Sequence, residues 1–260
     1  MKLKNYISKP FPNEVATVLA VFEKQYGLNF DGAMELNKEA LESLHKPTVH
    51  SQTPNAIIGN QELIQPHAKV LKKIANLPQD LIEDKQREEF LNSLIAIYSI
   101  LLRNGSNYTF DDDVHFIGIE REGAILAELL DMLPPSRSSR PHAKRATHNG
   151  GIIVGVSKLP TTRVVSRLVI TDGAIASGST LIAVLSQFDF ERAIVYSAHA
   201  TEQGVRAVNA FAKLIGKPII LNIGYMSGIL NEKFYAKNNK LYEVGDLGDM
   251  IAPLFIDKMR

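Results

Sequence analysis

The stretch Arg167–Leu181, RLVITDGAIASGSTL, passes from an apolar run through an acidic residue into a turn of small residues. The apolar run at Leu168–Ile170 predicts a buried strand, and a helical pattern opens at Leu181. Backbone N–H groups at the start of a helix bind anions, and small residues let a phosphate approach them closely. The stretch therefore predicts a strand–loop–helix unit that either binds a phosphate group or forms an ordinary turn without a ligand.

Asp172 follows the apolar run directly, at the expected carboxyl end of the strand, where open α/β sheets bind their ligands. A carboxylate beside a phosphate site suits ribose hydroxyls or a magnesium shell better than the phosphate itself. The stretch lacks the Gly-Lys-Ser/Thr ending of a Walker A loop and the glycine spacing of a dinucleotide fingerprint. Ser177 also lacks the first glycine of a nucleophile elbow.

The composition is that of a globular protein, with 260 residues of which 45% are hydrophobic and 22% charged. The formal net charge of +1 gives no indication of a nucleic acid or membrane partner. The absence of cysteine excludes disulfides, thiolate metal sites and a cysteine nucleophile. The first residues lack the apolar core of a signal peptide, and no apolar run approaches the roughly 20 residues of a membrane span. We therefore expect a cytoplasmic location.

Alternating strands and helices are predicted over most of the chain. After a long helix over Asp84–Arg103, strands are expected at His115–Ile119, Gly151–Val156, Arg167–Thr171, Arg192–Ala198 and Pro218–Ile223. Helices are expected between them over Glu122–Met132, from about Gly178, and over Glu202–Leu214. This order predicts an α/β domain whose mostly parallel sheet is covered by helices on both faces.

Ahead of this domain, helices are expected over Glu14–Tyr26 and Asp31–Leu44, followed by a loop-like segment at residues 46–60. We therefore divide the chain into a helical extension, residues 1–60, and an α/β domain, residues 61–260. The extension is expected to cover a surface or to make an oligomer contact.

The segment Asp172–Thr180, DGAIASGST, resembles the loop that binds phosphoribosyl diphosphate (PRPP) in type I phosphoribosyltransferases, most closely that of the uracil phosphoribosyltransferases. Further segments match that family in the same order, over roughly the last three quarters of the chain: IEREG at Ile119–Gly123, RATHNG at Arg145–Gly150, KLP at Lys158–Pro160, LNEK at Leu230–Lys233 and GDLGD at Gly245–Asp249. The resemblance implies a type I phosphoribosyltransferase-like, Rossmann-type fold.

The resemblance also implies an activity, the transfer of the phosphoribosyl group of PRPP to uracil or a related heterocyclic base, with release of pyrophosphate. With uracil the product would be UMP, as in pyrimidine salvage. Mg²⁺ would enter with PRPP and have no direct protein ligand, with Asp172 or Asp249 contacting it through water. A homodimer or larger homo-oligomer is implied, with neither a nucleic acid nor a membrane as partner.

The site residues implied by the resemblance fall into three groups. Arg121 and Arg145 would contact pyrophosphate through their forked, permanently charged donors, and Asp172 would hold the ribose hydroxyls. The other PRPP contacts would be Gly173, Ala174, Ile175, Ala176, Ser177, Gly178, Ser179, Thr180 and Asp246. The base would be bound by Tyr242, Glu243, Gly245, Asp246 and Leu247.

The chain departs from the family pattern at three places. Gly173 stands where the uracil enzymes have proline and other type I enzymes have a second acid. The segment from Gly150 to Lys158 is short and lacks the stretch that forms the family's hood over the site. Residues 234–244 are longer than the family segment, so Glu243 could accept a hydrogen bond from a base other than uracil. Two alternatives therefore stay open: a diverged transferase for a specialised base, and a PRPP- or nucleotide-binding regulator without catalysis.

Overall fold

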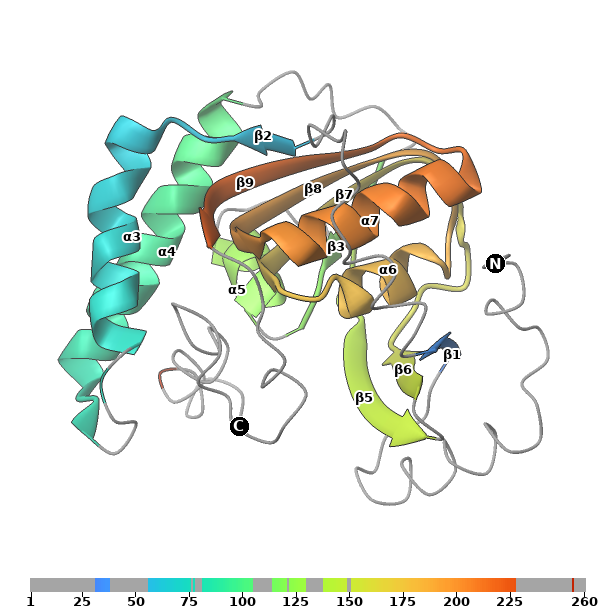
Figure 1. The fold of residues 1–260 in the computed structure, drawn as a ribbon, viewed down its shortest axis with the longest axis horizontal. Coiled ribbons are helices and arrows are strands. Elements are labelled where there is room, and N and C mark those ends of the chain that lie inside the picture. Colours follow the sequence, from blue (N-terminus) through green and yellow to red (C-terminus); the bar gives the residue numbers. More distant parts are fainter. Residues whose placement is uncertain are drawn as a thin grey trace.

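The computed structural model describes residues 31–37, 56–75, 77, 81–104, 114–120, 122–129, 138–148, 151–227 and 254. Within these residues, a central sheet of six strands has the order β2-β9-β8-β7-β3-β4, and every neighbouring pair in it is parallel (Figure 1). Its strands are β2 (Ala56–Ile58), β3 (Val114–Gly118), β4 (Ser138–Ser139), β7 (Val164–Ile175), β8 (Asp189–Thr201) and β9 (Ile219–Ser227).

A smaller antiparallel sheet of order β1-β6-β5 lies beside the central one (Figure 1). Its strands are β1 (Gly32–Asn37), β5 (His142–His148) and β6 (Gly151–Ser157). The described α-helices are α3 (Gln61–Ala75), α4 (Asp84–Asn104), α5 (Glu122–Leu129), α6 (Ser179–Leu185) and α7 (Glu202–Ile215).

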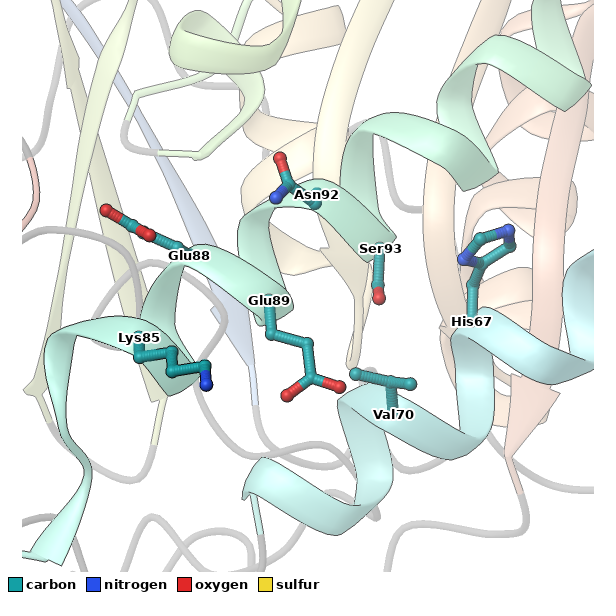
Figure 2. A pocket seen from close by; sticks show the side chains of 7 residues that line it. All are labelled: His67, Val70, Lys85, Glu88, Glu89, Asn92 and Ser93. Atoms are coloured by element: carbon teal, nitrogen blue, oxygen red, sulfur yellow. The ribbon is translucent and has the colours of Figure 1, made fainter.

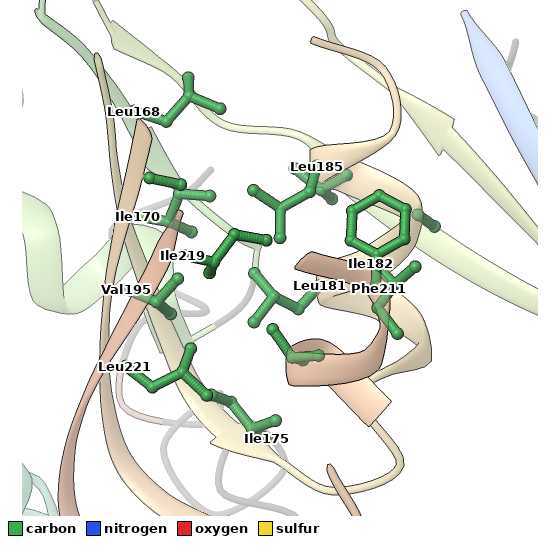
Figure 3. Close-up of a cluster of buried hydrophobic side chains, with 14 of the residues drawn as sticks. Leu168, Ile170, Ile175, Leu181, Ile182, Leu185, Val195, Phe211, Ile219 and Leu221 are labelled. Atoms are coloured by element: carbon green, nitrogen blue, oxygen red, sulfur yellow. The ribbon is translucent and has the colours of Figure 1, made fainter. Parts of the chain in front are cut away.

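Helices cover both faces of the central sheet. On one face, α6 and α7 bury Leu181 and Phe211 against Leu168, Ile170 and other strand residues (Figure 3). On the other face, α3, α4 and α5 pack in a second apolar cluster with strand residues such as Val169 and Tyr196. The apolar runs of the central strands are thus buried on both faces, as a parallel sheet requires, and the predicted mostly parallel α/β sheet is confirmed.

Two helices follow the sequence prediction closely because their signals are local. The α4 helix buries apolar residues at helical spacing: Phe90, Leu94, Ile97, Tyr98 and Leu101. The α7 helix is preceded by Thr201, whose side chain caps it by accepting a hydrogen bond from Gly204 N, and is followed by Gly216 in the left-handed conformation.

The prediction of a helix over Asp31–Leu44 is wrong at Gly32–Asn37, which form β1. This strand pairs in antiparallel register with β6, so the exposed edge of a strand far along the chain overrides the local helical pattern. The loop-like segment 46–60 contains β2, which pairs in parallel with β9. Both strands come from the first 60 residues, yet each pairs with a strand of the later part of the chain. The helix predicted over Glu14–Tyr26 lies outside the described residues.

The strand predicted at Gly151–Val156 exists as β6, but it does not join the parallel sheet. Only residues 149 and 150 separate it from β5, and a connection that short can join only antiparallel strands. The segment expected to be too short for a hood is therefore one arm of a β5–β6 hairpin.

Candidate functional site

The sheet order places a topological switch point between β3 and β7. From β3 the chain passes through α5 to β4 on one side, and it later returns to β7 on the other side of β3. Open α/β sheets bind ligands in the crevice outside the carboxyl ends of the strands at such a point. The residues that follow β3 and those that end β7 therefore form the candidate site.

Strand β7 extends farther than predicted. It runs to Ile175, and its register with β8 pairs Asp172 with Ser197 and Ala174 with His199. The expectation that Asp172 follows the strand is therefore wrong, and Gly173, Ala174 and Ile175 are strand residues rather than loop residues. The loop itself is confined to Ala176–Gly178, before α6 begins at Ser179.

The short loop is closely held. Gly178 has a φ of 76°, in the left-handed region that favours glycine, and no side chain in the described part of the chain caps α6. The hydroxyl oxygens of Ser177 and Ser179 lie 2.9 Å apart, and both side chains are buried. Thr201 Oγ1 donates to the Ala176 carbonyl oxygen at 2.5 Å, which ties the start of α7 to the loop. Thr180, the next predicted PRPP contact, is half-buried.

The carboxyl group of Asp172 is buried at this point, and its pKa is raised to about 8. Burial is the largest cause and the negative charge of Glu122 is the second, while the positive charge of Arg145 and backbone groups of Ala174 and Gly173 oppose them. Asp172 is therefore mostly protonated at pH 7. A neutral carboxyl group both donates and accepts hydrogen bonds, which suits it to sugar hydroxyls better than to direct coordination of a metal.

Arg145 reaches the site from the hairpin. It is exposed on β5, and its positive charge acts to lower the pKa of the buried Asp172 carboxyl group. The structure thus brings together two of the residues implied by the resemblance, although they belong to different sheets.

A polar cluster ties this hairpin to the carboxyl end of β3. Glu120 accepts a hydrogen bond from Lys158 Nζ at 2.6 Å, and its carboxylate is also hydrogen-bonded to His142 Nδ1 at 2.7 Å. Burial would raise the pKa of Glu120, but the hydrogen bonds and charges of His142 and Lys158 outweigh it and lower that pKa. Sequence reasoning missed Glu120 and His142, because a contact between residues this far apart in the sequence becomes visible only once the hairpin is placed.

Tyr98 is a second residue whose role the sequence did not indicate. It is fully buried on α4, and its hydroxyl group donates to the backbone oxygen of Asp172 at 2.5 Å. The pKa of the Tyr98 hydroxyl group is raised well above its usual value. Burial is the largest cause, followed by the negative charges of Asp172 and Glu122. A tyrosine within an apolar helical face is the available signal, since its hydroxyl group needs a polar partner when buried.

The other residues implied by the resemblance lie outside the described part of the chain: Arg121, Tyr242, Glu243, Gly245, Asp246, Leu247 and Asp249. Among the described residues, no three or more His, Asp or Glu side chains gather as metal ligands would. No helix in the described ranges is both long enough and apolar enough to cross a membrane.

A separate hollow of about 400 Å³ lies between α3 and α4 (Figure 2). It is lined by polar side chains and one valine: His67, Val70, Lys85, Glu88, Glu89, Asn92 and Ser93. None of them belongs to the switch point, and we assign the hollow no role.

Comparison with known proteins gives similarity of fold. No protein-family model and no curated protein matches the chain. Among solved structures, the AQ2163 protein from Aquifex aeolicus is similar with a TM-score of 0.51 and 16% identity, over 75% of this chain and 97% of that chain. Adenine phosphoribosyltransferase from Leishmania tarentolae is similar with a TM-score of 0.40 and 14% identity, over 68% of this chain and 94% of that chain.

Orotate phosphoribosyltransferase from Mycobacterium tuberculosis H37Rv, in complex with PRPP, is similar with a TM-score of 0.37 and 11% identity, over 63% of this chain and 89% of that chain. The chain therefore has an open α/β fold with a mostly parallel central sheet flanked by helices, and it shares this fold with AQ2163.

Proposed function

We propose that this protein binds PRPP and transfers its phosphoribosyl group to a heterocyclic base, with release of pyrophosphate. One observation carries the proposal: the loop Ala176–Gly178, Asp172 and Arg145 converge on the switch point of the sheet. These are residues that the sequence resemblance associates with PRPP, and they meet where an α/β sheet binds ligands.

In this proposal, each part of PRPP has a chemical counterpart in the site. The backbone of Ala176–Thr180 receives the 5′-phosphate, because its residues are small and Gly178 is in the left-handed conformation. The neutral Asp172 exchanges hydrogen bonds with ribose hydroxyls. Arg145 and Arg121 neutralise the charge that develops on the leaving pyrophosphate.

The residues near the loop fit a magnesium ion that enters with PRPP rather than one that the protein ligates directly. Asp172 and Glu122 are acidic side chains whose charges interact there, and an aspartate protonated at pH 7 is a poor direct ligand. The phosphate oxygens of PRPP are the hard donors that Mg²⁺ prefers. When bound, the ion would supply charge neutralisation to the leaving group.

The base acceptor is proposed from sequence alone. Uracil is the first candidate because Gly245–Asp249 resembles the uracil-binding segment, and Tyr242 and Glu243 would shape the pocket. An amino-bearing base is the alternative to test beside it. The homo-oligomer and the boundary near residue 60 stay predictions.

Pyrophosphate release with PRPP, Mg²⁺ and a panel of bases tests the proposal. Arg145→Ala should reduce the rate by roughly tenfold or more, because a hydrogen bond to a charged group contributes about 1.5–3 kcal/mol. Arg192→Ala is the matched control, since Arg192 is exposed near the start of β8, close to the amino end of the sheet.

The outcomes separate the alternatives. Release with uracil supports a uracil enzyme, and release with another base alone supports a diverged transferase. PRPP binding by calorimetry without release for any base supports a regulator. If the protein neither binds PRPP nor releases pyrophosphate, the PRPP assignment is overturned.

A further inference from the structure

The side chain of Glu122 lies over Gly173. A Cβ atom built on Gly173 would lie 1.9 Å from Glu122 Cγ and 2.8 Å from both Cδ and Oε1. Glu122, the first residue of α5, therefore occupies the space that a side chain at position 173 would fill. The second acidic group that acts on Asp172 is thus Glu122 of α5, and not a residue at position 173 of β7.

Backbone contacts hold Glu122 in this position. A Cβ atom on the next residue, Gly123, would lie 2.3 Å from the Thr171 carbonyl oxygen, so the start of α5 rests directly on β7. Thr171 Oγ1 also donates to the Gly123 carbonyl oxygen at 2.7 Å, and Ile119 N donates to the Thr171 carbonyl oxygen at 3.0 Å. The backbone at the start of α5, from which the Glu122 side chain extends, is thus held firmly against β7.

The electrostatics agree with this geometry. After burial, the charge of Glu122 is the largest cause that raises the pKa of Asp172, and Arg145 acts in the opposite direction. Two acidic groups and one arginine thus interact at the carboxyl end of β7. Two acidic side chains at one end of the strand offer acceptors for two hydroxyl groups at once.

We propose that Glu122 and Asp172 together bind the adjacent 2- and 3-hydroxyl groups of a ribose phosphate, and that Glu122 determines selectivity for ribose over 2-deoxyribose. This inference rests on the proposed function. A site that accepts hydrogen bonds from a sugar hydroxyl rejects the analogue without it, because the polar group is then left unpaired.

Calorimetric titration of the full chain with three probes tests the inference: ribose 5-phosphate, 2-deoxyribose 5-phosphate and inorganic phosphate. The wild type should bind ribose 5-phosphate roughly tenfold more tightly than the deoxy sugar, as expected for one hydrogen bond to a charged group. Glu122→Ala should weaken the binding of ribose 5-phosphate at least about fivefold and leave the binding of the deoxy sugar and of phosphate unchanged.

Two further variants make the test independent of folding. Glu122→Gln keeps the side-chain volume over Gly173 and removes only the charge, so it should lose a smaller part of the selectivity. Glu89→Ala is the matched control, because Glu89 is exposed on α4 and lines the separate hollow. It should bind all three probes as the wild type does.

Each result decides the question. Unchanged selectivity in both Glu122 variants overturns the inference while leaving PRPP binding in place. Equal weakening of the binding of all three probes in the Glu122 variants also overturns the inference, because Glu122 would then only support the loop. A wild type that binds PRPP but none of the three probes overturns the inference and leaves the proposed function in place, whereas one that also fails to bind PRPP refutes the proposed function.

Discussion

Thr201→Val is the sharpest test of how the candidate loop is held. Thr201 is 2% exposed, and its hydroxyl group makes two hydrogen bonds at once. It donates to the Ala176 carbonyl oxygen at 2.5 Å and accepts from Gly204 N at 3.0 Å. Valine has nearly the same shape and keeps the branched Cβ, so the substitution removes the hydroxyl group and little else.

The expected loss follows from the two bonds. Removal of the N-cap of α7 costs about 1 kcal/mol. The Ala176 carbonyl oxygen then lies buried without that donor, which costs about 1–3 kcal/mol more. A Cβ atom on Gly204 would lie only 2.3 Å from this oxygen, so the packing there is close. We therefore expect the free energy of unfolding to fall by about 2–4 kcal/mol.

Urea unfolding measures this loss, with Thr201→Ser as the matched control. Serine keeps the donor and the acceptor, so it should lose only the small contribution of one methyl group, about 1 kcal/mol. With a slope of about 2–3 kcal/mol per molar urea, Thr201→Val should lower the unfolding midpoint by roughly 1 M. Equal midpoints for the serine and valine variants would refute the reasoning, because the hydroxyl group would then contribute nothing.

Three further perturbations test other contacts at the site. Gly173→Ala should destabilise the fold by about 1–3 kcal/mol through overlap with Glu122, and a double variant that adds Glu122→Ala should recover most of it in urea unfolding; additive losses would contradict the overlap. Burial raises the pKa of Asp172 from 3.8 to about 8, so the folded state binds the extra proton and loses stability as pH rises between these values. Asp172→Asn should therefore gain stability relative to the wild type progressively from pH 4 to pH 8, and a difference independent of pH would disprove this. Tyr98→Phe should cost about 1–2 kcal/mol in urea unfolding, because it leaves the backbone oxygen of Asp172 without that donor, and an unchanged midpoint would count against the contact.

Local sequence signals were sufficient to predict several helices and strands of this protein. The helical spacing of apolar residues identified α4, and the helix predicted over Glu202–Leu214 agrees with α7 to within one residue. Continuous apolar runs identified β3, β8 and β9, because a strand buried on both faces has to be apolar throughout. The α3 helix was not predicted, and Pro66 inside it weakens its helical pattern.

The location of the candidate loop could also be predicted from the sequence. An apolar strand, a turn of small residues and a helical pattern occur in this order in Arg167–Leu181, and the structure has a strand, a short loop and a helix there. The strand end was misplaced because β7 continues only as long as β8 lies beside it. That pairing is a long-range property which no local pattern in β7 contains.

The neighbours of Asp172 were decided by tertiary structure alone. Tyr98, Glu122 and Arg145 come from α4, α5 and β5, and each acts on Asp172 only because packing brings these elements to one end of the sheet. The β1 strand likewise exists because β6 offers an edge for it. Composition and periodicity thus identified α4, α5, α6 and α7 and the strands β3, β6, β7, β8 and β9, but not α3, β4 or β5. Long-range backbone pairing and packing determined which side chains meet at the switch point, and so the chemistry available there.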